Sequence, residues 1–399
     1  MIKKIKKPEL KCPVKNWASL EACKDYADAI YFGCGLSLRS RAHGIKLVEL
    51  DKFVNKAHSY NIKAYLTVNS AIYNKDLEKA KKVLKKAKDS EIDGVIVWDP
   101  ATIMIAKEFG LNIIISTQAN VSNYESAKFY QKLGAKRIVL AREMTLKQIK
   151  ELKQKTKIEV ESFVHGAMCM AISGRCLLSS YLFGKSANCG SCAQPCRKEW
   201  FLTDEAGNKI STEGQFFMNA KDLCMIEYIP EMIESGIDSF KIEGRKRDPK
   251  YIQIVSKYYR LAIDSYFDGT YTKAKAKEWK EEMNKVYNRG FSTGFYFGEL
   301  GKEGISYDKA DNVSGIKKYQ VGYITHYFPK IKVALVKLCQ RSLKIGEEVA
   351  FEGEKTFFEQ KIESMEREKE TITKGNKGEE VGIKVNQKVR IGDNLFTFK

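Results

Sequence analysis

Six of the ten cysteines in this chain fall in one short stretch, and they are the residues best suited to carry chemistry. The other four, Cys12, Cys23, Cys34 and Cys339, are scattered among apolar residues, as small core residues often are. A chain with no secretion features is expected in a reducing compartment, where crowded thiols point to metal or redox chemistry rather than to disulfides. The six crowded cysteines are Cys169, Cys176, Cys189, Cys192, Cys196 and Cys224.

The spacing of these thiols favours an iron-sulfur cluster. Cys169, Cys176, Cys192 and Cys196 stand at intervals of seven, sixteen and four, so four thiolates can converge on one centre, with glycines between them. Structural zinc sites usually contain two close cysteine pairs, and here only Cys192 and Cys196 form one. Zinc and six unrelated buried cysteines are the alternatives. We expect a cluster on these four residues, with Cys224 or Cys189 as the replacement if Cys196 is not a ligand. The spacing leaves the nuclearity of the cluster open, and [4Fe-4S] is the type we expect.

The elements that must position these cysteines read as alternating strands and helices. Amphipathic stretches such as 76–88 and 124–133 separate eight short apolar runs. Eight β-then-α units in about 240 residues predict a (β/α)8 barrel. An open doubly wound sheet is the alternative, but no Gly-x-Gly-x-x-Gly follows the first run. The runs are 9–12, 29–32, 64–68, 94–98, 112–116, 137–140, 160–164 and 239–242.

Polar residues collect just after these predicted strands. The carboxyl ends of barrel strands open onto one face, where active sites are built. Each residue taken alone fits a loop cap or a rim ion pair as well, but their recurrence favours a shared site. The candidates are Arg39, Arg41, Gln118, Asn120, Arg142, His165, Glu243 and Arg245, together with Arg175 among the cysteines.

The chain divides into three predicted parts. Residues 1–247 form the barrel, and the segment 167–222 is a long insertion that carries the cysteines, where function is expected. Residues 248–317 form a helical extension, with helices over 251–267 and 272–287. Residues 318–399 alternate short strands with glycine turns, which predicts a small C-terminal β-barrel.

The net charge and the hydropathy of the chain indicate which kinds of partner to expect. The formal net charge is +19, from 69 Lys and Arg against 50 Asp and Glu, which favours a polyanion such as nucleic acid. Lysines spread over solvated helix faces are the alternative explanation. The chain contains no apolar run of eighteen residues, and its charged start has no apolar stretch behind it. We therefore expect a cytoplasmic protein without membrane contact, and we predict no stable protein partner.

Several motifs together resemble one known family. The cysteine region is similar to the signature of the collagenase-like peptidases of unknown catalytic type, family thirty-two, and most of all to their tRNA hydroxylation branch, the prephenate-dependent tRNA uridine hydroxylases. The resemblance covers essentially the whole chain. The other segments that carry it are Tyr26–Gly33, Leu38–Arg41, Ser116–Asn120, Asn219–Leu223 and Lys241–Arg245.

The resemblance implies an RNA-modifying enzyme that hydroxylates the wobble uridine of tRNA at C5, with an iron-sulfur cluster and with prephenate as co-substrate. Arginines match the two carboxylates of prephenate, so Arg39, Arg41, Arg142, Arg175 and Arg245 are the candidates to bind it. Gln118, Asn120 and His165 are then candidates to orient the substrate. Related branches hydroxylate a ribosomal RNA cytidine.

Two other function classes remain open from the sequence. The family name implies a peptidase, which needs an activated nucleophile or a metal-bound water. The chain has four histidines and neither a His-Glu-x-x-His nor a Gly-x-Ser-x-Gly motif, which argues against peptidase activity. A non-catalytic iron-sulfur subunit is the third class.

Overall fold

The computed structural model describes residues 5–34, 44–209, 215–308 and 311–398, which form two compact units. The first unit comprises Met1–Lys15, Cys23–Arg247 and Tyr251–Ser314, so residues 251–314 belong to the same unit as the barrel strands. The second comprises Asn16–Ala22, Asp248–Lys250 and Gly315–Lys399.

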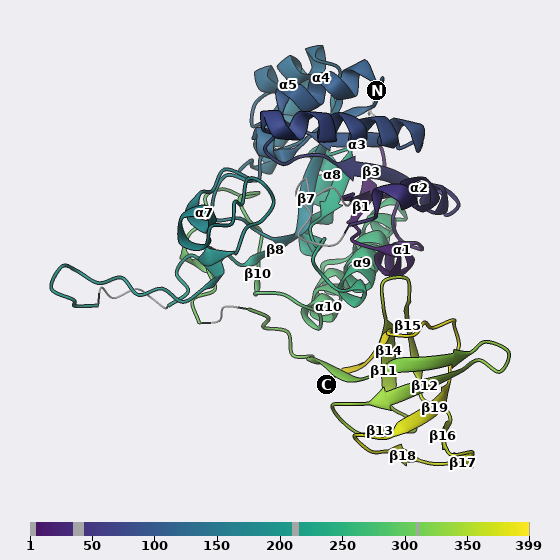
Figure 1. The fold of residues 1–399 in the computed structure, drawn as a ribbon. Helices are drawn as coiled ribbons and strands as arrows, with labels where there is room; N and C mark the ends of the chain where they lie inside the picture. The colour runs from purple at the N-terminus through teal and green to yellow at the C-terminus, as the bar shows by residue number, and fades with distance from the viewer. Residues whose placement is uncertain (1–4, 35–43, 210–214, 309–310, 399) are drawn as a thin grey trace. The chain divides into compact units, whose positions relative to one another are not determined.

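Eight parallel strands of the first unit close into a barrel (Figure 1). Neighbouring strands follow chain order, and the last closes the ring by pairing with both the first and the seventh, where Ser239 stands opposite Glu161. The predicted (β/α)8 barrel is confirmed. Its strands are β1 (Glu9–Pro13), β2 (Ala29–Phe32), β3 (Lys63–Thr67), β4 (Gly94–Val97), β5 (Ile113–Ile115), β6 (Ala135–Val139), β7 (Glu159–Ala167) and β9 (Ser239–Ile242).

Helices alternate with these strands along the chain and begin at recognisable caps. The Asp99 side chain accepts a hydrogen bond from the backbone N–H of Ala101 (2.9 Å), which fixes the start of the following helix. Strands β2 and β4 are buried at every position, which explains why they read as apolar runs. The helices are α1 (Trp17–Cys23), α2 (Leu50–His58), α3 (Leu77–Asp89), α4 (Pro100–Glu108), α5 (Tyr124–Lys132), α6 (Leu146–Lys155), α7 (Leu178–Phe183), α8 (Ile229–Glu234), α9 (Pro249–Phe267) and α10 (Lys273–Asn284).

The cysteine insertion and two short strands interrupt the regular alternation after β7. Helix α7 and a short 3-10 turn, Pro195–Arg197, lie within the insertion. Strand β8 (Asp222–Cys224) returns antiparallel to the end of β7, and β10 (Phe291–Ser292) pairs with β8. These two strands extend the sheet beyond the closed barrel at the end of β7, next to the insertion.

The second unit consists of antiparallel β-sheets around an apolar core that includes Val336, Phe351, Met365 and Leu395. One sheet has eight strands, in the order β15-β14-β20-β11-β12-β19-β16-β17, and β13 pairs with β18. The predicted fold class is thus confirmed in both parts. The strands are β11 (Lys318–Phe328), β12 (Val333–Leu338), β13 (Leu343–Lys344), β14 (Glu348–Glu352), β15 (Phe357–Lys361), β16 (Met365–Arg367), β17 (Glu370–Thr371), β18 (Lys374–Gly375), β19 (Glu380–Lys384) and β20 (Asn394–Phe398).

Candidate functional site

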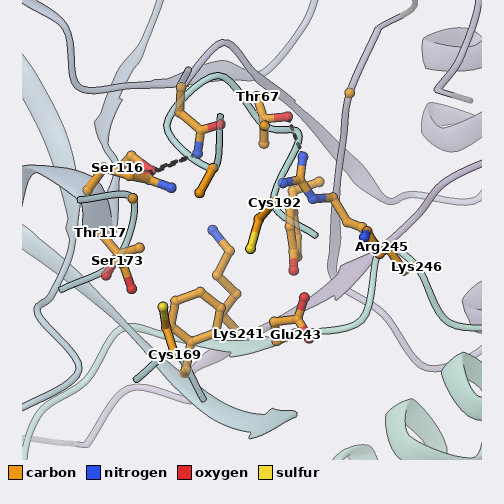
Figure 2. Close-up of a pocket in the computed structure, with 18 of the residues that line it drawn as sticks. Thr67, Ser116, Thr117, Cys169, Ser173, Cys192, Lys241, Glu243, Arg245 and Lys246 are labelled. Atoms are coloured by element: carbon orange, nitrogen blue, oxygen red, sulfur yellow. Dashed lines mark hydrogen bonds between the residues drawn. The ribbon is translucent and has the colours of Figure 1, made fainter. Parts of the chain in front are cut away.

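A cavity of about 310 Å³ opens where the carboxyl ends of the barrel strands meet the cysteine insertion (Figure 2). Side chains at or just after β1, β2, β3, β5, β6, β7 and β9 line it, as expected for a barrel active site. Of the candidates from sequence, six line the cavity: Gln118, Arg142, Cys169, Cys192, Glu243 and Arg245.

One wall of the cavity is a buried amide and hydroxyl cluster. The Nδ2 of Asn69, after β3, donates to Ser116 Oγ (2.9 Å) and to Gln118 Oε1 (3.1 Å), both after β5. Asn69 Oδ1 is buried and has no hydrogen-bond partner among the described residues. Asn120 caps the turn after β5 in the left-handed conformation that asparagine tolerates, and it is not among the residues that line the cavity.

Cations dominate the remaining walls. Arg245 donates through Nη1 to Thr67 Oγ1 (2.9 Å), and Arg142 donates through Nη1 to the carbonyl oxygen of Ala167 (2.6 Å) while its guanidinium stacks 4.0 Å over Phe163. Lys15, Lys241 and Lys246 also line the cavity, and Glu243 is the only carboxylate among its described lining residues. This charge balance suits an anionic ligand, because guanidinium and ammonium groups pair with carboxylates.

Two glycines fix the backbone that carries Glu243. Gly166 has a φ of +104°, and a Cβ there would lie 2.5 Å from the carbonyl oxygen of Glu243. Gly244 has a φ of +159°, and a Cβ there would lie 2.6 Å from the Tyr251 ring. Only glycine allows the end of β7 to approach the Glu243 backbone at Gly166, and the chain after β9 to approach the Tyr251 ring of α9 at Gly244.

A network of buried ion pairs fills the barrel beneath the cavity. Glu161 on β7 accepts from Lys11 Nζ on β1 (2.5 Å) and from Lys241 Nζ on β9 (2.7 Å), and Arg137 on β6 lies 3.3 Å from it. Arg137 also pairs with Glu9 on β1, a strand that is not its neighbour in the sheet, so these side chains cross the barrel interior.

The network sets the protonation of its members. Burial raises the pKa of Glu161, but Lys11, Lys241 and Arg137 outweigh this effect and hold the pKa below its usual value. Burial lowers the pKa of Lys241 to about 8, against the opposing influence of Glu161.

The other three candidate cysteines lie close enough to Cys196 to affect the pKa of its thiol. Cys169 and Cys192 both line the cavity (Figure 2). Burial raises the pKa of the Cys196 thiol, and the neighbouring thiols of Cys169, Cys192 and Cys176 raise it further. Among the described residues, no three His, Cys, Asp or Glu side chains are already arranged to hold a metal ion.

The two reserve cysteines lie elsewhere. Cys224 is buried on β8 next to the Tyr259 hydroxyl, and burial raises the pKa of its thiol to about 11. Cys189 interacts with Tyr73, after β3. The thiols with the largest influence on the pKa of Cys196 are instead Cys169, Cys192 and Cys176.

Hydrogen bonds hold the insertion in place. The backbone N–H of Gln194 points at Cys192 Sγ (3.3 Å), and that of Ala193 donates to Ser179 Oγ (2.7 Å). Arg197, buried next to Cys196, donates to Asn219 Oδ1 (2.5 Å), to the carbonyl oxygen of Met168 (2.6 Å) and to that of Ala220. Arg197 therefore joins both ends of the insertion, a role that its position in the sequence does not indicate.

The other candidates lie away from the described cavity lining. His165 is buried among Tyr251, Tyr259 and Phe291, and burial lowers its pKa to about 3, so it is a neutral ring beneath the cavity. Arg175 is exposed on the insertion. Arg39 and Arg41 lie outside the described residues.

Lys15, Tyr31 and Lys241 also line the cavity, although they were not among the candidates from sequence. A charged residue within an apolar strand was the available signal for Lys241, and the same signal marks Lys11, Arg137 and Glu161. Tyr31 carried no such signal, because tyrosine is common in buried strands.

Comparison with known proteins identifies the family. The sequence profile of peptidase family U32 matches residues 15–306. The chain belongs to this family. The motifs that carried the resemblance, including the cysteine region, lie within the matched residues.

Relatives within the family carry different names. An uncharacterized protease of Methanocaldococcus jannaschii is 43% identical over 98% of both chains. A collagenase of Porphyromonas gingivalis is 36% identical over 98% of this chain and 97% of its own. The tRNA hydroxylation protein P1 of Bacillus subtilis is 37% identical over 87% of this chain and 84% of its own.

In the part of the chain that the structure describes, no helix is long and apolar enough to cross a membrane.

Proposed function

We propose that this U32 protein is an RNA-modifying enzyme that hydroxylates the wobble uridine of tRNA at C5, with an iron-sulfur cluster and prephenate. The observation that carries the proposal is the shared cavity: cysteine thiols and a set of cations line the same space at the barrel mouth. Membership of a family that includes tRNA hydroxylation protein P1 supports the choice of reaction.

The cysteine group fits an iron-sulfur cluster by its donors. Cys169, Cys176, Cys192 and Cys196 supply four thiols, all of them at least partly exposed, and thiolates are the usual ligands of such clusters. The N–H of Gln194, 3.3 Å from Cys192 Sγ, is the kind of donor that tunes a cluster potential. A bound cluster would supply electron transfer at the cavity.

The cavity cations fit a dicarboxylate such as prephenate. Arg142 and Arg245 are held at fixed positions by Ala167 and Thr67, so their free donors are preorganised. The amide wall of Asn69 and Gln118 offers hydrogen bonds to a hydroxyl group. The surplus of cations over the chain, +19 in total, favours attraction of RNA to the protein.

Deleting the gene tests the proposed function directly. We expect nucleoside mass spectrometry of total tRNA to show loss of the C5-oxygen modification at wobble uridines, and the same loss when prephenate synthesis is blocked. Persistence of the tRNA modification, in a strain with no second copy, would reject the proposal. Loss of a hydroxycytidine from ribosomal RNA would then identify that substrate instead.

A peptidase is the second candidate, because a collagenase is 36% identical over nearly the whole chain. Among the described residues no histidine lines the cavity, so none of them supplies the base of a Cys-His or Ser-His pair there. Release of peptides from denatured collagen by the purified protein, abolished in Cys192→Ser, would favour this candidate. No release would leave the RNA-modifying enzyme or a non-catalytic iron-sulfur subunit, which the nucleoside analysis separates.

A further inference from the structure

Lys241 is a buried lysine that nevertheless reaches the cavity. Its exposed fraction is 4%, yet it lines the cavity together with Cys169 and Glu243 (Figure 2). Its ammonium donates to Glu161 Oε1 (2.7 Å) and lies 4.3 Å from the centre of the Tyr31 ring. An ammonium has three donors, and the carboxylate of Glu161 takes one of them.

The charge of Lys241 is only partly compensated from below. Among the described residues, Lys241 forms an ion pair only with Glu161, and it shares that carboxylate with Lys11 and Arg137. Arg137 has further carboxylate partners in Glu9 and Glu159 (2.8 Å), and Lys11 lies 3.7 Å from Glu9. A buried charge without full compensation is costly, and a ligand anion in the cavity would complete its pairing.

Unpaired polar atoms in the same cavity also indicate a ligand. Asn69 is 6% exposed, and its Oδ1 has no hydrogen-bond partner among the described residues. Arg142 Nε is likewise buried without a described partner. Buried acceptors and donors are normally satisfied, so a ligand that offers both a carboxylate and a hydrogen-bond donor would pair them.

We propose that Lys241 binds the carboxylate of a small hydroxy acid at the cavity floor, and that Glu161 is the positioning residue that holds its ammonium there. This inference rests on the proposed function for the identity of the probe, because prephenate carries both carboxylates and a hydroxyl group. Arg142 and Arg245 then remain for a second anionic group of the same ligand.

The pH dependence follows from the groups that surround Lys241. These are Lys11 on β1, Tyr31 on β2, Arg137 on β6, Glu161 on β7 and Arg245 after β9. Burial lowers the pKa of Lys241 to about 8, so its ammonium loses charge as the pH rises through that value. Carboxylate binding should therefore weaken between pH 7 and pH 9. Glu161→Gln removes the stabilising carboxylate and should shift this loss of binding to lower pH.

Isothermal titration of prephenate, phenylpyruvate and malonate into the full-length protein tests the assignment. Lys241→Met keeps the length of the side chain and removes the charge, and should weaken carboxylate binding about 10-fold to 100-fold, as expected for one charge-assisted hydrogen bond. Lys241→Arg should still bind carboxylates, and its affinity should no longer fall between pH 7 and pH 9. The matched control is Lys153→Met, which removes a lysine paired with Asp238 (2.7 Å) and absent from the cavity lining, and should bind like the wild type. Thermal melts report whether each variant is folded.

The outcomes separate this inference from the proposed function. Prephenate binding that is equal in Lys241→Met and wild type overturns the role of Lys241 and leaves the proposed function standing. Lys241-dependent binding of malonate or phenylpyruvate, without binding of prephenate, supports the anion site and rejects prephenate as the co-substrate. Absence of binding by all three carboxylates to the wild type overturns both.

Discussion

At the scale of single residues, the cavity depends on groups whose protonation is set by burial. His165 is the clearest case, since it is fully enclosed by three aromatic rings and Arg247 adds to the burial effect that lowers its pKa to about 3. Its Nδ1 lies 3.4 Å from the Tyr259 hydroxyl, which itself donates to the carbonyl oxygen of Val164. The neutral ring therefore packs on β7 between the aromatic side chains, and it is not among the described residues that line the cavity.

The low pKa of His165 predicts a specific loss of stability in acid. The unfolded chain takes up this proton near pH 6.5, whereas the folded chain takes it up only near about 3, so the contribution to stability is complete above 6.5 and is lost as the pH falls. The slope is up to about 1.4 kcal/mol per pH unit. The free energy of unfolding of His165→Phe, measured in urea between pH 6 and pH 4, should depend less steeply on pH than that of the wild type. The difference between the two slopes should be about this amount. An identical dependence in both proteins would contradict a buried neutral histidine.

At the scale of elements, the insertion is attached to the barrel through Arg197. Its guanidinium donates to Asn219, Ala220 and Met168, all near the two ends of the insertion, and its neighbour Cys196 belongs to the cysteine group. The side chain thus couples the position of one candidate ligand to the end of β7 and to the start of β8. Nothing in the sequence pattern separates Arg197 from a surface arginine.

Removing this arginine should loosen the insertion. Arg197→Met leaves three buried acceptors without their donor, and we expect the free energy of unfolding to fall by on the order of 3 kcal/mol, together with lower iron content after anaerobic purification. Lys198→Met, on the next residue and exposed, should change neither property. Equal iron content and stability in the two variants would show that the insertion is held by other contacts.

The strands of the barrel were predictable from sequence, while the ion pairs inside it were not. Runs such as Gly94–Val97 are apolar because both faces are buried, and that signal is local in the chain. The pairing of Lys11 with Glu161 joins residues 150 positions apart and exists only once the barrel closes. The place of arginines after strands correctly located Arg142 and Arg245 at the cavity, whereas Arg175, chosen because it lies among the cysteines, is outside the lining. The short strands β8 and β10 escaped prediction because their pairing depends on the insertion.

At the scale of the whole molecule, the net charge of +19 predicts salt-sensitive RNA binding. Each phosphate that the protein neutralises releases counterions and adds roughly 0.7 to 0.9 to the slope of log affinity against log salt. Filter binding of transfer RNA at several salt concentrations should therefore give a steep negative slope. Salt-independent binding, or none, would favour a protein substrate over RNA.

The proposed function places the cysteine group and RNA hydroxylation in one enzyme. The most direct measurement is nucleoside mass spectrometry of transfer RNA from a deletion strain complemented with single cysteine variants. We predict that the wild type restores the C5-oxygen modification of wobble uridines, and that Cys339→Ser, whose cysteine lies in the second unit, does so too. Cys192→Ser should accumulate as a folded protein but should not restore the modification. Restoration of the modification by Cys192→Ser would contradict the claim.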